Sequence, residues 1–261
     1  DGDTLPLGAH ALSFFTAPMV HWPEVIIGYE RAEKVLFSAD AFGKFGPPDF
    51  SDGWVDEARR YYFNIVGKYG AQVAALLKKA SSLDIKAICP LHGPVIRENL
   101  PFYIGKYDAW SGYRPEDKGV LVAWASMHGH TSFAAKRFAE MLRQRGVESV
   151  VEMDLSRAWV SKAVASAFRY DRMAVFAASY DAGLFPSMED FLLHLKAKAY
   201  QKRRVGVVEN GSWAPAAGKR MRALLEEMKD VEILEPAVTI RSSMKPETER
   251  ELERLADRMS N

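Results

Sequence analysis

The second half of the chain alternates short apolar runs with amphipathic segments of helical period. Runs rich in strand-forming residues lie at 120–124, 149–153, 173–179, 205–209 and 231–234. Each is followed by a segment in which apolar residues recur every three to four positions, at 131–145, 159–169, 187–200, 215–228 and 246–259. These patterns predict strands and helices, respectively. Five consecutive βα units predict a doubly wound, five-stranded parallel sheet, which binds its ligand at the carboxyl ends of the strands.

The first half has a different pattern, in which short β-rich runs come first and helices follow. Strands are predicted at 11–15, 25–29, 35–38 and 85–89, and helices at 54–83, with a break at 67–70, and at 101–110. Residues 111–117 contain glycine and proline and predict an interdomain linker. We therefore expect an α/β protein of two domains, 1–114 and 115–261.

Composition narrows the classes of function. Lys plus Arg number 35 and Asp plus Glu number 34, so no net field attracts the chain to nucleic acid or to an anionic membrane surface. No signal peptide is recognisable, and no apolar run is long enough to span a bilayer. The single cysteine, Cys89, excludes an internal disulfide and a Cys-x-x-Cys metal site. We expect a cytoplasmic protein with neither nucleic acid nor a membrane as a partner.

The turn Ser126-Met127-His128-Gly129-His130-Thr131 joins the first predicted strand of the second half to its helix. The free N–H groups and dipole of the helix start, together with the hydroxyls of Ser126 and Thr131, form a potential anion site. The loop contains no Lys or Arg. A phosphate held by neutral donors suits a mononucleotide such as FMN better than a transferable γ-phosphate, which normally needs a lysine and a metal. The alternative is an ordinary turn capped by Ser and Thr.

Two further strand-end loops, 179–186 and 209–213, each combine a glycine with a large aromatic residue. Such loops let the backbone approach a flat ring while Tyr180 or Trp213 packs against it. Alternatively, these aromatics cover the edge of the sheet. Three such loops at one edge favour a flavin site. The predicted cofactor-binding residues are Ser126, Met127, His128, Gly129, His130, Thr131, Ser179, Tyr180, Asp181, Ala182, Gly183, Asn210, Gly211, Ser212 and Trp213.

The first half contains three candidate metal ligands, His21, Asp40 and His92. Each ends a predicted strand or begins a loop, so the three can converge at one edge of a sheet. Two imidazoles and a carboxylate suit iron, zinc or manganese. The alternative for each histidine is a hydrogen-bonded structural role.

Both halves resemble the flavodiiron proteins, also called A-type flavoproteins. Residues 124–131 resemble that family's FMN phosphate loop, and residues 178–186 and 209–215 resemble its two isoalloxazine loops. Residues 1–114 resemble the second half of the family's metallo-β-lactamase-like domain. The matching stretches are Pro18-Met19-Val20-His21-Trp22-Pro23, Asp40-Ala41-Phe42-Gly43 and Pro90-Leu91-His92-Gly93.

The resemblance implies a metal centre that this sequence does not complete. In the family, the residue that matches Asp40 bridges two irons, and a His-x-Glu-x-Asp-His motif supplies four more ligands. That motif does not occur in this sequence. The first eight residues have the pattern of a strand edge from within a domain and contain no initiator methionine. We therefore expect that an N-terminal half-domain is missing, and that either another polypeptide supplies it or the metal site is vacant.

The function that the resemblance implies is a flavodiiron oxidoreductase. In this family FMN passes electrons from an external donor to a di-iron site, which reduces O2 to water, NO to N2O, or both. The implied partners are a second copy in a head-to-tail homodimer, or a higher oligomer, and a separate electron donor such as a rubredoxin-type protein or a reduced cofactor. One alternative is an FMN-binding electron carrier with a metal-free remnant. Another is a zinc hydrolase, which the flavin loops and the absent ligands disfavour.

Overall fold

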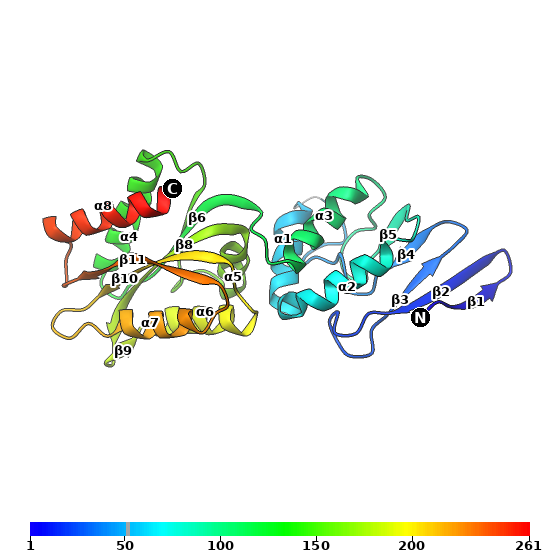
Figure 1. Ribbon diagram of the computed structural model, residues 1–261, viewed down its shortest axis with the longest axis horizontal. Coiled ribbons are helices and arrows are strands. Elements are labelled where there is room, and N and C mark those ends of the chain that lie inside the picture. Colours follow the sequence, from blue (N-terminus) through cyan, green and yellow to red (C-terminus); the bar gives the residue numbers. More distant parts are fainter. Residues whose placement is uncertain (51–52) are drawn as a thin grey trace. The chain divides into compact units, whose positions relative to one another are not determined.

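The structure, a computed structural model, describes residues 1–50 and 53–261 and divides the chain into two compact units, Asp1–Arg114 and Pro115–Asn261 (Figure 1). The first unit contains a sheet in the order β1-β2-β3-β4-β5. Neighbouring strands from β1 to β4 are antiparallel, and β5 joins β4 in parallel. The strands are β1 (Asp3–Leu7), β2 (His10–Thr16), β3 (Ile26–Glu30), β4 (Val35–Phe37) and β5 (Ala87–Cys89).

The helices of the first unit pack around a cluster of aromatic side chains. They are α1 (Trp54–Tyr61), α2 (Gly70–Ala80) and α3 (Leu100–Ser111), with a π-helical turn at Tyr62–Val66 and a 3-10 turn at Gly67–Tyr69 between the first two. The rings of Trp54 and Tyr62 each contact those of Tyr107 and Trp110, with centroids 5.2–6.4 Å apart. Burial of these large rings stabilises the unit by removing apolar area from water.

The predicted break in the long helical region falls where the chain passes close to the end of α3. A Cβ atom added at Gly70 would lie 2.5 Å from the carbonyl oxygen of Ser111 and 2.9 Å from the ring of Tyr113. The Tyr113 hydroxyl also donates a hydrogen bond to the carbonyl of Gly67, at 2.9 Å. Glycine is therefore required at position 70 by this close approach, and α2 begins there.

The second unit is a doubly wound α/β domain, which confirms the predicted fold class. Its parallel strands lie in the order β11-β10-β8-β6-β7. The sheet consists of β6 (Asp117–Ala125), β7 (Val150–Asp154), β8 (Tyr170–Tyr180), β10 (Arg203–Asn210) and β11 (Val231–Ile240). When these five strands are counted along the chain, their order in the sheet is the one found in flavodoxin. In that fold the ligand site lies where the strand order reverses, which here is between the first strand, β6, and the third, β8.

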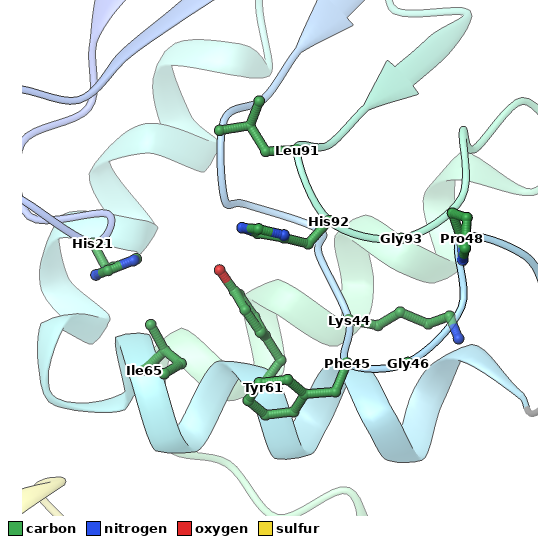
Figure 2. A pocket seen from close by; sticks show the side chains of 10 residues that line it. All are labelled: His21, Lys44, Phe45, Gly46, Pro48, Tyr61, Ile65, Leu91, His92 and Gly93. Atoms are coloured by element: carbon green, nitrogen blue, oxygen red, sulfur yellow. The ribbon is translucent and has the colours of Figure 1, made fainter.

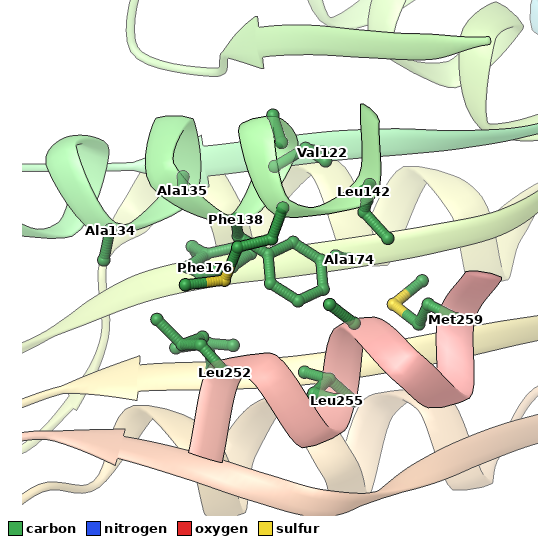
Figure 3. Packing of buried hydrophobic residues seen from close by; sticks show 14 of the residues in the cluster. Val122, Ala134, Ala135, Phe138, Leu142, Ala174, Phe176, Leu252, Leu255 and Met259 are labelled. Carbon is green, nitrogen blue, oxygen red and sulfur yellow. The ribbon is translucent and has the colours of Figure 1, made fainter. Parts of the chain in front are cut away.

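Helices cover both faces of this sheet. They are α4 (His130–Gln144), α5 (Val160–Arg169), α6 (Pro186–Ala197), α7 (Ala217–Glu226) and α8 (Pro246–Ser260). Figure 3 shows the core between the sheet and the pair α4 and α8, where Phe138, Phe176, Leu252 and Leu255 are fully buried. The other three helices pack beside one another, α5 on α6 and α6 on α7. None of the helices in the described ranges is long and apolar enough to cross a membrane.

The segment after β8 differs from the predicted loop. Strand β8 continues to Tyr180 and forms a hairpin with β9 (Gly183–Leu184), which adds a short antiparallel strand to the predicted five. Asp181 and Ala182 form the two-residue turn, with φ angles of 47° and 57°. A tight hairpin turn normally places Asn-Gly or Asp-Gly in this left-handed region. The Asp-Ala pair lacks that signal, which explains why the hairpin was not predicted.

We predict that Gly70→Ala lowers the free energy of unfolding by roughly 1 to 3 kcal/mol, because the new methyl group overlaps backbone and must force α2 and α3 apart. Urea-induced unfolding measures the change. Gly105→Ala is the matched control, since an added Cβ there meets nothing within 4 Å inside helix α3. The Gly105→Ala substitution should raise the free energy of unfolding by up to about 1 kcal/mol, because alanine has a higher helix propensity than glycine. Equal effects of the two substitutions would contradict the close approach at Gly70.

Candidate functional site

A pocket of about 780 Å³ lies at the carboxyl ends of β6, β8 and β10. All three predicted loops contribute to this sheet-edge pocket, which is where a doubly wound fold places its ligand. Three of the predicted residues, Ser126, Gly129 and Gly183, are not among those that line it. The lining residues are Met127, His128, His130, Thr131, Ala178, Ser179, Tyr180, Asp181, Ala182, Asn210, Gly211, Ser212, Trp213, Ala214 and Ser242.

The turn before α4 gives its two hydroxyls different positions. Ser126 and Gly129 line an adjacent polar pocket of about 390 Å³. Gly129 has a φ of 90°, and its N–H donates to the Ser126 Oγ at 3.2 Å, so this hydroxyl closes the turn. Thr131 instead lines the sheet-edge pocket, although it is only 3% exposed, and its hydroxyl has no hydrogen-bond partner among the described residues. Of the two hydroxyls in this turn, that of Thr131 is therefore the one that faces the sheet-edge pocket.

Ser179 joins the two other loops of the sheet-edge pocket. Its Oγ accepts hydrogen bonds from the N–H groups of Ala216 at 2.9 Å and Ala217 at 3.2 Å, at the start of α7. A Cβ added at Gly211 would lie 3.1 Å from this Oγ and 2.8 Å from the Cα of Pro215. Glycine thus allows the loop after β10 to fold back closely against Ser179. The role of Ser179 that the geometry shows is to hold this loop.

The aromatic residues of the sheet-edge pocket present uncovered rings. Trp213 is 88% exposed and Tyr180 is 41% exposed. Tyr180 contacts Phe185 edge to face, with ring centroids 5.6 Å apart. An aromatic side chain that served to cover the edge of the sheet would itself be largely buried, and Trp213 is not. The exposure of its ring favours a role in contacting a flat ligand.

The first unit contains a second pocket, of about 590 Å³, which is lined by two of the candidate metal ligands, His21 and His92. Figure 2 shows His21, His92 and Tyr61 directed toward one space. The Nε2 atoms of His21 and His92 lie 3.6 Å and 3.5 Å from the carboxylate of Asp40. This histidine pocket is lined by His21, Lys44, Phe45, Gly46, Pro48, Tyr61, Ile65, Leu91, His92 and Gly93.

Each imidazole faces a different oxygen of Asp40: His21 faces Oδ2 and His92 faces Oδ1. Two atoms bonded to one ion lie roughly 3 to 3.6 Å apart when each bond is about 2.1 Å long. The spacing would therefore leave room for a metal ion beside each histidine, and the resemblance to flavodiiron proteins implies that the carboxylate bridges two such ions. The described residues contain no cluster of three or more His, Cys, Asp or Glu side chains that could hold a metal ion. A bridged pair of ions at this place thus requires ligands beyond these three side chains.

Tyr61 belongs to the histidine pocket and was not predicted from the sequence. Its hydroxyl donates a hydrogen bond to the Oδ1 of Asp40 at 3.1 Å. Burial, followed by the negative charge of Asp40, raises the pKa of the Tyr61 phenol well above its ordinary value. Tyr61 therefore remains a donor to the carboxylate at neutral pH. In the sequence, Tyr61 has the spacing of any aromatic residue on the buried face of a helix. Its contact with Asp40 could therefore not be predicted from the sequence.

Comparisons with known proteins identify the homologues of this chain as flavodiiron proteins. An uncharacterized protein of Methanocaldococcus jannaschii is 28% identical over 94% of this chain and 64% of its own length. The anaerobic nitric oxide reductase flavorubredoxin of Vibrio vulnificus is 27% identical over 94% of this chain and 51% of its own length. The rubredoxin-oxygen oxidoreductase of Megalodesulfovibrio gigas is 26% identical over 92% of this chain and 61% of its own length. The chain thus spans only part of the curated relatives that it matches, and no protein-family model matches it.

Solved structures support the same conclusion for the fold. Rubredoxin oxygen:oxidoreductase from Desulfovibrio gigas has a TM-score of 0.91 at 23% identity, covering 99% of this chain and 67% of that one. The flavodiiron protein from Giardia intestinalis has a TM-score of 0.90 at 23% identity, covering 100% of this chain and 66% of that one. The resemblance inferred from the sequence motifs is therefore confirmed at the level of family relatives and fold.

We predict that Ser179→Ala lowers the free energy of unfolding by about 1 to 2 kcal/mol, because two N–H groups at the start of α7 lose their acceptor. Denaturant-induced unfolding is the measurement. Ser243→Ala is the control, since Ser243 is exposed and its side chain makes no hydrogen bond to the described residues. If both substitutions were neutral, Ser179 would not be the residue that holds the loop.

Proposed function

We propose that the chain is the FMN-binding and partly metal-binding portion of a flavodiiron oxidoreductase. In this function FMN delivers electrons to a di-iron centre that reduces O2 to water, NO to N2O, or both. The observation that carries the proposal is the sheet-edge pocket, in which three loops combine a buried donor, Thr131, with the uncovered rings of Tyr180 and Trp213. The printed names of the relatives, a nitric oxide reductase and an oxygen oxidoreductase, support it.

The residues of the sheet-edge pocket fit FMN in both size and chemistry. The start of α4 offers N–H groups and a positive dipole end to a phosphate, and Thr131 adds a hydroxyl donor. Gly211 lets the loop after β10 fold closely against Ser179, and the exposed ring of Trp213 in that loop would pack against a flat ring. Bound FMN supplies the redox chemistry. The residues orient the cofactor and shield it from water.

In the first unit we propose a site for half of a di-metal centre, within the second half of a metallo-β-lactamase-like domain. His21, His92 and Asp40 would hold the metal ions, with each histidine beside a different oxygen of the carboxylate. Tyr61 donates to this carboxylate and so limits its rotation. The metals supply open coordination positions for a diatomic gas. The remaining ligands must come from polypeptide outside these 261 residues.

A second candidate function is that of an electron carrier which binds FMN and no metal. The absence of a complete metal-binding cluster among the described residues favours it. The two functions share the sheet-edge pocket and differ in the role of the histidine pocket. Iron content therefore separates them.

The proposed function requires partners. We propose a head-to-tail homodimer or higher oligomer, in which the FMN of one subunit would lie near the metal centre of another, as the resemblance to flavodiiron proteins implies. A separate donor, such as a rubredoxin-type protein or a reduced cofactor, delivers the electrons. The name of the oxygen-reducing relative, which includes rubredoxin, supports this class of donor.

We predict that the purified chain binds about one FMN and is yellow, and that Thr131→Ala weakens FMN binding by roughly 1 to 3 kcal/mol through loss of a hydrogen bond to a charged group. Fluorescence titration with FMN measures the dissociation constants. Thr248→Ala is the matched control, because Thr248 is also buried in the first turn of a helix but does not line the pocket. Wild-type protein that binds no FMN would refute the proposed function, whereas equal dissociation constants would remove Thr131 alone from the site.

We predict that the chain alone binds fewer than two irons, and that Asp40→Asn reduces iron binding further because the amide removes a negatively charged ligand oxygen. Metal analysis after anaerobic loading and desalting gives the stoichiometry. The control is Asp84→Asn, since Asp84 lies in the same unit but pairs with Lys34, whereas Asp40 lies beside His21 and His92. Iron content that is identical in the two variants would refute the role of Asp40, and no iron in any of them would favour the electron carrier.

A further inference from the structure

The sheet of the first unit has apolar side chains on both of its faces. Residues that lie opposite each other in neighbouring strands share a face, so the registers of β1 to β4 assign each side chain. One face carries the buried residues Ser13, Ile27, Tyr29 and Leu36. Four apolar residues of the opposite face are 46–57% exposed, and we call it the uncovered face. Its apolar residues include Leu5, Leu7, Leu12, Phe14, Ile26 and Phe37.

This pattern is typical of strands that are buried on both sides. An antiparallel sheet with one face in water normally alternates apolar and polar residues along each strand. Here apolar residues follow one another without a break, as in Phe14-Phe15, Ile26-Ile27 and Val35-Leu36-Phe37. Glu30 also lies on the uncovered face, but it is 9% exposed and accepts hydrogen bonds from two N–H groups of the following turn. A contiguous exposed apolar surface of this kind marks a protein interface.

The uncovered face continues into the histidine pocket. Ile26 belongs to the uncovered face and also lines a hollow of about 540 Å³ beside it. Leu91 lines both this hollow and the histidine pocket. Trp22 lies between them, and the side chains of Trp22 and Leu91 are 57% and 69% exposed. A single polypeptide that packs on the uncovered face can therefore reach His21 and His92.

We propose that polypeptide outside these 261 residues packs on the uncovered face and, in the same docking, brings further metal ligands to the histidine pocket. The inference rests on the proposed function, whose metal site requires ligands from elsewhere. This chain spans 64% of the Methanocaldococcus jannaschii relative, so about a third of that protein has no counterpart here. The occupant corresponds to that part. It presents an apolar sheet face of its own, because two sheets pack about 10 Å apart through interdigitating apolar side chains.

A second copy of this chain is the competing occupant. It would cover the apolar side chains, but it would bring no complete ligand set, because the described residues contain no cluster of three or more His, Cys, Asp or Glu side chains that could hold a metal ion. The two occupants differ in whether the uncovered face becomes covered when no other polypeptide is present.

Cys89 provides a reporter for the uncovered face. It lies opposite Phe37 in the register of β4 and β5, is partly exposed and is the single cysteine of the sequence. In the test, the chain is coexpressed with the part of the Methanocaldococcus jannaschii relative that it does not match, produced as a separate polypeptide. Alkylation of Cys89 by iodoacetamide is then measured on the purified native protein. We expect the two polypeptides to copurify, and Cys89 to react at least tenfold more slowly than in the chain alone.

The double variant Ile26→Lys and Phe37→Lys places two charges on the uncovered face. It should lose copurification, and its Cys89 should react as in the chain alone. Because both positions are exposed, the thermal unfolding of this variant should match that of the wild type. The matched control is Leu193→Lys, since Leu193 is 44% exposed on α6 in the second unit. This control should copurify and protect Cys89 as the wild type does.

The wild-type chain that fails to copurify, or whose Cys89 is not protected by the coexpressed polypeptide, overturns the inference. A dimer of the wild-type chain alone that the double variant converts to a monomer assigns the face to a second copy and also overturns it. FMN binding and the iron content of the complex report the proposed function separately. A stable complex that binds neither cofactor would refute that function and the delivery of ligands, but it would retain the docking surface.

Discussion

The register of three parallel strands is the constraint on which the second unit depends. Strand β8 pairs with β6 on one side and β10 on the other, so that Ala177 lies opposite Ala125 and Ala178 lies opposite Asn210. The paired parts of the three strands therefore end at nearly the same level, and β8 continues beyond them to Tyr180 in its hairpin with β9. A shift of one strand by two residues would move its loop by about 7 Å and open the pocket. The helices on both faces bury the sheet and so hold this register.

The first unit depends on a buried negative charge. The side chain of Asp40 is 7% exposed, and burial of an unpaired carboxylate is costly. Tyr61 donates to it, and two imidazoles lie within 3.6 Å. Tyr61 and the two histidines are therefore the groups that offset the charge of Asp40 among the described residues.

Much of this architecture could be predicted from the pattern of apolar residues. The strip Leu252, Leu255 and Met259 has the helical spacing that places it against the sheet, and all three are fully buried. The contacts within the two sites were harder to predict, because they join residues that are distant in the chain. Ser126 and Thr131 look equivalent in sequence, and only the turn at Gly129 decides which hydroxyl faces the pocket. Tyr61 could not be recognised, because its partner Asp40 is 21 residues away and no local pattern joins them.

The most direct test of the central claim is a crystal structure of the chain grown with FMN and iron, with anomalous data collected at the iron edge. The account predicts flavin density in the sheet-edge pocket, with the phosphate beside Thr131 and the ring against Trp213. It also predicts any anomalous peak in the first unit beside the carboxylate of Asp40. Flavin bound elsewhere, or a sheet-edge pocket that remains empty at saturating FMN, would contradict it.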